Sequence, residues 1–221
     1  MFKRAMPVDP KLLEKDFESS PEVALIPEMV RTLKSLQTPE QYEYLDSTYQ
    51  ISKTMSELWF NINHKYGINL RDREKLYPVF KELSRIFGTQ QHSVLYRGVR
   101  LPKGPDQNFL TRMNNEKGEP DLRILTILEN LAYGLRSWTS RKKTAISGWG
   151  IRPGDTRDVI IFKIHNPEIV LDTNKFSDKL IHLDVYIFDN HEVILYLKDP
   201  EVVDLEIIYP GVYLVTVVDK G

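Results

Sequence analysis

The spacing of apolar residues changes along this chain, and this change most constrains its fold. In the first eighty-odd residues, apolar side chains recur at intervals of three and four, which is the period of a helix with one buried face. The stripes are Val23, Ile26, Met29, Val30, Leu33 and Leu36; Ile51, Met55, Leu58, Trp59, Ile62 and Tyr66; and Leu76, Tyr77, Phe80, Leu83, Ile86 and Phe87. We interpret their aromatic members as core residues, because helix-spaced aromatics usually fill cores.

Local signals mark where these helices begin and end. Ser20 precedes a proline, as expected of an N-cap, and residues 38–41 read Thr-Pro-Glu-Gln, which is typical of a capping box. We therefore expect one helix after Ser20 and one after Thr38. Gly88 is expected to end the third helix.

Strand-like patterns dominate the remainder of the chain. Short apolar or alternating runs predict strands near 93–99, 135–140, 159–164, 192–197, 204–209 and 212–218. Between them, a helix is expected over 120–131, and residues 143–149 are expected to form one or two helical turns. The sequence therefore predicts a single α+β domain, with a helical N-terminal segment at 1–88 and a β-rich core at 89–221.

Composition excludes several classes of function. Lys+Arg number 30 and Asp+Glu number 31, so the net charge of −1 provides no overall field to hold a nucleic acid or an anionic membrane. The only dense basic cluster is 141–143, which could dock a partner. Cysteine is absent, which excludes disulfides, thiolate metal sites and a cysteine nucleophile. No apolar run has membrane-spanning length, and the first residues lack a signal peptide, so we expect a soluble, cytoplasmic protein.

The familiar catalytic motifs are also missing. The five histidines are scattered, so no metal site is expected, and no phosphate-binding loop or Gly-x-Ser-x-Gly elbow occurs. Three short segments do combine suitable chemistry: a strand arginine followed by glycine, a hydroxyl-rich strand, and a glutamate that opens a later strand. They are Tyr96-Arg97-Gly98, Ser137-Trp138-Thr139-Ser140 and Asn190-His191-Glu192-Val193-Ile194-Leu195.

In the order and spacing of these segments the chain resembles the mono-ADP-ribosyltransferases of the arginine-serine-glutamate class. Ala145 and Trp149 also stand where that family has an alanine and an aromatic residue. The resemblance covers roughly residues 94–218 and implies a mainly antiparallel core of two sheets. The size of the chain is similar to that of the small ADP-ribosyltransferases that T-even-like bacteriophages make inside infected bacteria.

The resemblance implies NAD⁺ as a substrate, no metal, and roles for three residues in catalysis. Arg97 would bind a phosphate, since a guanidinium offers planar, charge-assisted bonds. Glu192 would bond the 2′-hydroxyl of the nicotinamide ribose and stabilise the positive charge that develops on that sugar. Ser137 would hold Glu192 in place. The implied NAD⁺-binding set is Tyr96, Arg97, Gly98, Ser137, Thr139, Ser140 and Trp149.

Two departures from the family pattern leave alternatives open. The hydroxyl motif contains Trp138, so either Ser137 or Thr139 can take the serine role, depending on strand register. Asn190 stands where arginine-modifying members have a glutamate, and it would orient the acceptor only by hydrogen bonding. We expect transfer of ADP-ribose to a protein of a bacterial host. The alternatives are an NAD glycohydrolase and an inactive binding or inhibitor protein.

Overall fold

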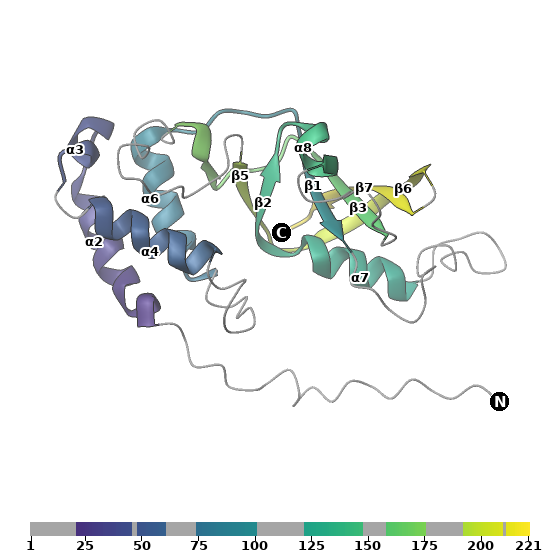
Figure 1. Cartoon of the computed structure of the whole chain (residues 1–221), viewed down its shortest axis with the longest axis horizontal. Helices are drawn as coiled ribbons and strands as arrows, with labels where there is room; N and C mark the ends of the chain where they lie inside the picture. The colour runs from purple at the N-terminus through teal and green to yellow at the C-terminus, as the bar shows by residue number, and fades with distance from the viewer. Residues whose placement is uncertain are drawn as a thin grey trace.

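The structure is a computed structural model, and it describes residues 21–45, 48–60, 74–100, 122–147, 158–175, 192–209 and 211–221. The helices that precede residue 88 gather at one end of the molecule, and the strands lie at the other end with later helices packed on them (Figure 1). The helical elements are η1 (Pro21–Leu25), α2 (Ile26–Ser35), α3 (Pro39–Glu43), α4 (Thr48–Phe60), α6 (Tyr77–Phe87), α7 (Leu122–Ala132), α8 (Lys142–Ser147) and η3 (Thr173–Lys175). The strands are β1 (Val94–Arg100), β2 (Gly134–Thr139), β3 (Val159–His165), β4 (Leu171–Asp172), β5 (Glu192–Leu197), β6 (Pro200–Tyr209) and β7 (Val212–Asp219).

The N-terminal helices differ from the sequence prediction in two places. The helix expected after Ser20 starts as the 3-10 segment η1, and α2 begins at Ile26 because Pro27 is tolerated only in a first turn. The capping box at Thr38 is confirmed, with Gln41 N–H donating to Thr38 Oγ1 and Thr38 N–H donating to Gln41 Oε1. The helix that it starts ends at Glu43, however, and the stripe from Ile51 to Trp59 belongs to a separate helix, α4. Ile62 and Tyr66 of that stripe lie outside the described residues.

The α+β prediction is confirmed, whereas the expected pair of sheets is not found. The described strands form one seven-stranded sheet in the order β4-β5-β2-β1-β3-β7-β6. All neighbouring pairs are antiparallel except β3 and β7. A single pair, Tyr96 with Thr139, joins β1 to β2, so the sheet is continuous through one bridge at this point.

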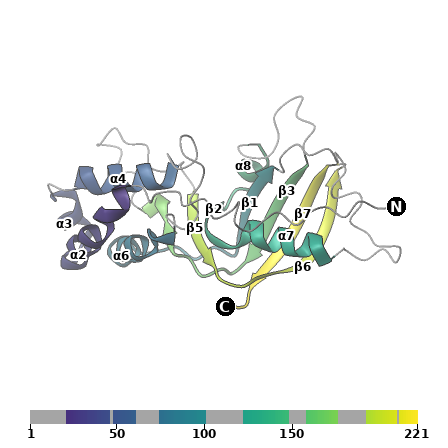
Figure 2. The ribbon, with the colours of Figure 1, turned by 90° about the horizontal axis from the view of Figure 1, so that it is seen from below.

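The sheet is covered on both faces (Figure 2). Helix α7 buries Ile124, Leu128 and Ala132 against one face, and α8 places Ala145 on the other. Helices α4 and α6 pack at the end of the sheet that carries β4 and β5. Leu135 and Ile194 of the sheet share one apolar cluster with these helices. The helical region and the sheet therefore share a core at this end.

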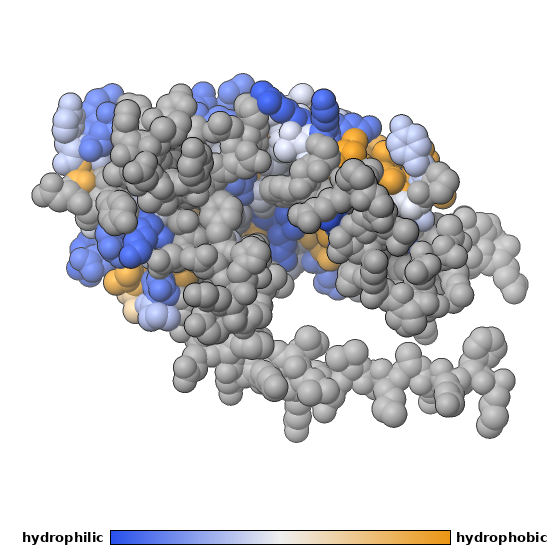
Figure 3. All heavy atoms as spheres, in the orientation of Figure 1, coloured by the Kyte–Doolittle hydropathy of each residue, from blue (hydrophilic) through white to orange (hydrophobic). Residues whose placement is uncertain are grey.

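Two surface features stand out among the described residues. The large apolar side chains of β6 are exposed at Val203, Ile207 and Tyr209, and an apolar patch is visible at that end of the molecule in Figure 3. The basic cluster of residues 141–143 is exposed as well. No helix in the described ranges is long and apolar enough to cross a membrane.

Tyr42 makes the stability of the helical region depend on pH. Burial raises the pKa of Tyr42 to about 12 from its ordinary 10, against a smaller lowering by the hydrogen bond with Ser52. Because the pKa of Tyr42 is higher in the folded state, its contribution to the free energy of unfolding is fully present below pH 10. That contribution is lost as the pH rises through 12. Urea unfolding of Tyr42→Phe should therefore show a shallower loss of stability over this range than the wild type, and equal slopes would contradict the assignment.

Candidate active site

Glu192 is the first residue of β5, as the sequence predicted, and its side chain is 4% exposed. Its cross-strand partner is Thr139 on β2, and the partner of Thr139 on the other side is Tyr96 on β1. Cross-strand partners in a sheet project from the same face. Tyr96, Thr139 and Glu192 therefore form one row across three adjacent strands, although they lie far apart in the sequence.

Arg97 follows Tyr96 at the point where β1 and β2 separate. One Cα pair joins these two strands, whereas β1 and β3 are paired from Val94 to Arg100. The guanidinium lies across the interval, where Nη1 donates to the backbone oxygen of Ser137 at 3.0 Å. The Arg97 side chain thus donates a hydrogen bond to the Ser137 carbonyl, in the place where a continuous β1–β2 ladder would supply a backbone N–H. Only β2 separates the strand of Arg97 from that of Glu192.

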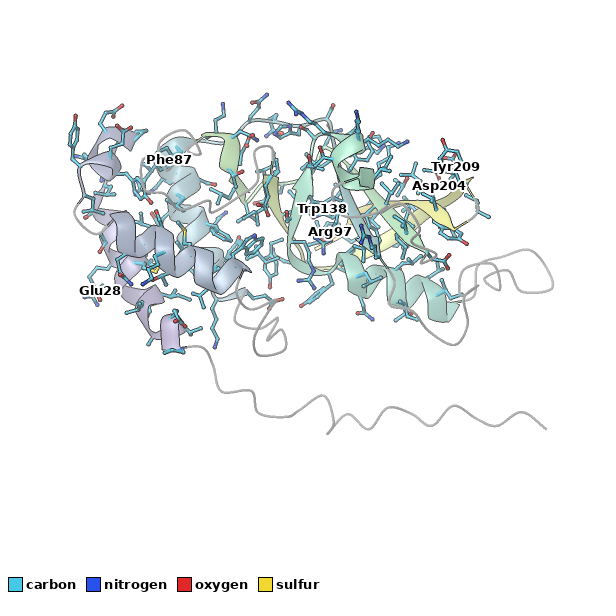
Figure 4. The ribbon with its side chains drawn as sticks, viewed as in Figure 1. Glu28, Phe87, Arg97, Trp138, Asp204 and Tyr209 are labelled. Carbon is cyan, nitrogen blue, oxygen red and sulfur yellow. The ribbon has the colours of Figure 1, made fainter. Side chains whose placement is uncertain are left out.

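Strand alternation decides which residues of the hydroxyl motif share a face with Glu192. Thr139 pairs with Glu192 and Ser137 with Ile194, so both hydroxyl residues belong to that face. Trp138 pairs with Val193 and packs in the cluster beneath α7. Figure 4 shows Trp138 and Arg97 among the central strands. Of the two candidate hydroxyls, Thr139 is thus the direct neighbour of Glu192, and Ser137 is its diagonal neighbour.

The three hydroxyls of this motif have different surroundings. Thr139 Oγ1 accepts a hydrogen bond from the backbone N–H of Arg141 at 3.1 Å, just ahead of α8. Ser137 is buried, and its Oγ has no hydrogen-bond partner within the described part of the chain. Ser140 is exposed at the end of the strand. A buried hydroxyl without a partner calls for an explanation, and a ligand atom would provide one for Ser137.

Gly98 faces α8 at very short range. A Cβ at this position would lie 2.0 Å from the backbone oxygen of Ala145, a distance that no side chain can occupy. Ala145 is itself fully buried against this part of the sheet, and Tyr96 packs beside it. The close approach that glycine indicates in a strand is therefore made by another backbone segment of the same chain.

Two residues that hold Glu192 were missed by the sequence analysis. The indole Nε1 of Trp59, near the end of α4, donates to Glu192 Oε1 at 3.1 Å. Thr173 in η3 donates its hydroxyl to the backbone oxygen of Glu192 at 2.6 Å. Trp59 belongs to a helix-spaced apolar stripe, and no local pattern separates it from the other core positions. These contacts fix both the backbone and the carboxylate of Glu192.

The segment that carries Thr173 is itself braced. Asp172 is fully buried, and its Oδ2 lies 3.2 Å from His92 Nε2. Its Oδ1 accepts from the backbone and side-chain nitrogens of Asn174. Because Asp172 also pairs with Val193 on β5, this network fixes the chain on either side of the Thr173 contact to Glu192.

The predictions for Trp149 and Asn190 fall on residues outside the described ranges. Within those ranges, no group of three or more histidine, aspartate or glutamate side chains is arranged to hold a metal ion.

No protein-family model and no curated protein matches the chain. Among solved structures, it is similar to Vis toxin, an ADP-ribosyltransferase from Vibrio splendidus, at 12% identity and a TM-score of 0.38, over 95% of this chain and 89% of that one. It is also similar to the ADP-ribosyltransferase HopU1 of Pseudomonas syringae, at 16% identity and a TM-score of 0.35, over 73% of this chain and 64% of that one. It is similar as well to C3larvin toxin, an ADP-ribosyltransferase from Paenibacillus larvae, at 11% identity and a TM-score of 0.28, over 85% of this chain and 97% of that one. At these TM-scores the likeness does not establish a shared fold, and we base the proposed function on the residues of the site.

Proposed function

We propose that this protein is a mono-ADP-ribosyltransferase that moves ADP-ribose from NAD⁺ to a protein acceptor and releases nicotinamide. One observation carries the proposal. The three motif segments, distant in sequence, lie on the adjacent strands β1, β2 and β5, with Tyr96, Thr139 and Glu192 in one row and Arg97 bonded to Ser137. The hydroxyls and the carboxylate share one face of the sheet, and the guanidinium of Arg97 reaches the interval between β1 and β2 at the backbone of Ser137. These groups suit a substrate with both phosphates and a sugar that becomes positively charged.

In this reaction the bond between C1′ of the ribose and the nicotinamide nitrogen breaks, and nicotinamide leaves with the bonding electrons. Glu192 would accept a hydrogen bond from the ribose 2′-hydroxyl and stabilise the positive charge on the sugar. The acceptor then bonds to C1′ and gives up a proton. A carboxylate held in a buried position offers more stabilisation than one in water, because fewer water molecules screen it.

Arg97 would bind the phosphates of NAD⁺. A guanidinium has five N–H donors, so a phosphate contact is compatible with the bond to the carbonyl of Ser137. The hydroxyl of Ser137, buried on the same face as Glu192, would bond the donor or the carboxylate. Gly98 would hydrogen-bond the nicotinamide amide through its backbone.

Two features bear on the acceptor of ADP-ribose: the residue type at Asn190 and the resemblance to enzymes made by bacteriophages. Because an asparagine cannot deprotonate an incoming guanidinium, Asn190 would orient the acceptor through hydrogen bonds alone. We infer an acceptor protein in the cytoplasm of a bacterial host, modified during host takeover. The exposed basic cluster at 141–143, beside the hydroxyl strand, would contribute to docking of that protein.

The test is incubation of the protein with NAD⁺ labelled in its ADP-ribose part and a bacterial lysate. The proposal expects transfer of label to one or a few lysate proteins, together with release of nicotinamide. Release of free ADP-ribose without labelled protein would instead establish an NAD glycohydrolase. Absence of both cleavage and NAD⁺ binding at millimolar concentration would favour a binding or inhibitor protein, and either result would overturn transfer.

A further inference from the structure

The contact between Trp59 and Glu192 joins the helical region to the candidate active site. The indole Nε1 and the carboxylate Oε1 lie 3.1 Å apart, and the two residues are separated by 133 positions in the sequence. Both side chains are almost fully buried, at 2% and 4% exposure. An indole N–H only donates, so this pair has one possible polarity, and the bond is charge-assisted when Glu192 is ionised.

The indole is itself held in a fixed position. Its ring packs edge to face with Phe80 of α6, at 5.4 Å between centroids and 78° between planes. Around it, the stripe of α4 is buried at Ile51, Met55 and Leu58. A donor held by packing on two helices cannot follow a carboxylate that rotates, so it selects one orientation of that carboxylate.

The other side of Glu192 is held independently. Thr173 fixes the backbone oxygen of Glu192, and the pairing with Thr139 fixes its strand register. With the backbone set by the sheet, the remaining freedom of Glu192 lies in its side-chain torsions. Trp59 restricts those torsions through the hydrogen bond that joins α4 to β5.

We propose that Trp59 is a positioning residue for Glu192, so that the N-terminal helices set the orientation of the carboxylate that acts on the ribose. This inference rests on the proposed function. Reactions that depend on electrostatic stabilisation need the charged group in place before the transition state forms, so loss of the indole N–H lowers the rate of bond cleavage more than it lowers NAD⁺ affinity.

Trp59→Phe removes the N–H and keeps an aromatic ring against Phe80. Because hydrogen bonds to charged groups are strong, we expect kcat for nicotinamide release to fall about tenfold to a hundredfold, with the KM for NAD⁺ changed by less than about threefold. Tyr42→Phe is the matched control, since it removes a buried hydroxyl of the same helical cluster that hydrogen-bonds to Ser52. Its kcat should equal that of the wild type. A wild-type kcat in Trp59→Phe, or an equal loss in Tyr42→Phe, would overturn the proposal.

A second measurement does not depend on catalysis or on the folding of the Trp59 variant. The measurement is the NMR spectrum of the ¹⁵N-labelled full chain. The indole N–H signal of Trp59 is assigned by its loss in Trp59→Phe or, if that variant does not fold, by a triple-resonance experiment. Glu192→Gln should move that signal upfield, because a neutral amide is a weaker acceptor than a carboxylate. An unmoved signal would overturn the contact. A wild-type protein that does not cleave NAD⁺ would overturn the proposed function and the positioning role of Trp59 together, while the indole signal still decides whether the contact exists.

Discussion

Replacement of Glu192 by glutamine is expected to lower the rate of nicotinamide release from NAD⁺ by about a hundredfold or more, with the fold retained. The substitution keeps the size of the side chain and removes the negative charge that would stabilise the sugar as its bond to nicotinamide breaks. Glutamine can still accept the indole N–H of Trp59 through its amide oxygen. The charge, and not the packing at the start of β5, is therefore what the variant tests.

The rate is measured as nicotinamide released from saturating NAD⁺, alongside circular dichroism and thermal unfolding of the same preparation. Glu168→Gln is the control, because that glutamate is 86% exposed and pairs only loosely with Lys81. Its rate should stay within about twofold of the wild type, as surface substitutions usually have small effects. A fully active Glu192→Gln variant would exclude Glu192 as the catalytic carboxylate.

The second large effect is expected at Gly98. Substitution by alanine places a Cβ 2.0 Å from the backbone oxygen of Ala145, and neither partner is a flexible side chain. Helix α8 must therefore shift away from β1. Overpacking of this kind typically costs about 1–3 kcal/mol or more of unfolding free energy. For a chain of this size, that corresponds to a fall in Tm of roughly 2–12 °C.

Differential scanning calorimetry measures this effect, and Val99→Ile provides the control. That change adds a single methyl group to the neighbouring residue of β1, which is half-buried and projects from the opposite face of the sheet. Its effect on the unfolding free energy should be smaller than that of Gly98→Ala, because a half-buried side chain can extend toward solvent. If Gly98→Ala and Val99→Ile have the same Tm, the close packing of α8 on β1 is wrong.

Local sequence patterns predicted the elements that local chemistry determines. The capping box at Thr38, the helix end at Gly88 and the start of β5 at Glu192 all depend on residues within a few positions of one another. The number of sheets was wrong because it depends on whether β1 and β2 pair at all. That pairing consists of one bridge, and no periodicity in either strand encodes it.

The site shows the same division between local and long-range information. A glycine within a strand indicates the close approach of a ligand or of another backbone, and at Gly98 the structure has a backbone segment of α8. Trp59 was interpreted as a core residue, which its burial confirms, but its bond to Glu192 spans most of the chain. Spacing within a helix reports which face is buried. It does not report which polar atom of another element that face meets.

The central claim is that one NAD⁺ molecule binds where β1, β2 and β5 meet, and a crystal structure of the Glu192→Gln variant with NAD⁺ tests it most directly. We expect the 2′-hydroxyl of the nicotinamide ribose within hydrogen-bond distance of residue 192, and a phosphate within reach of the Arg97 guanidinium. NAD⁺ bound elsewhere on the protein, with both of these residues away from it, would contradict the claim.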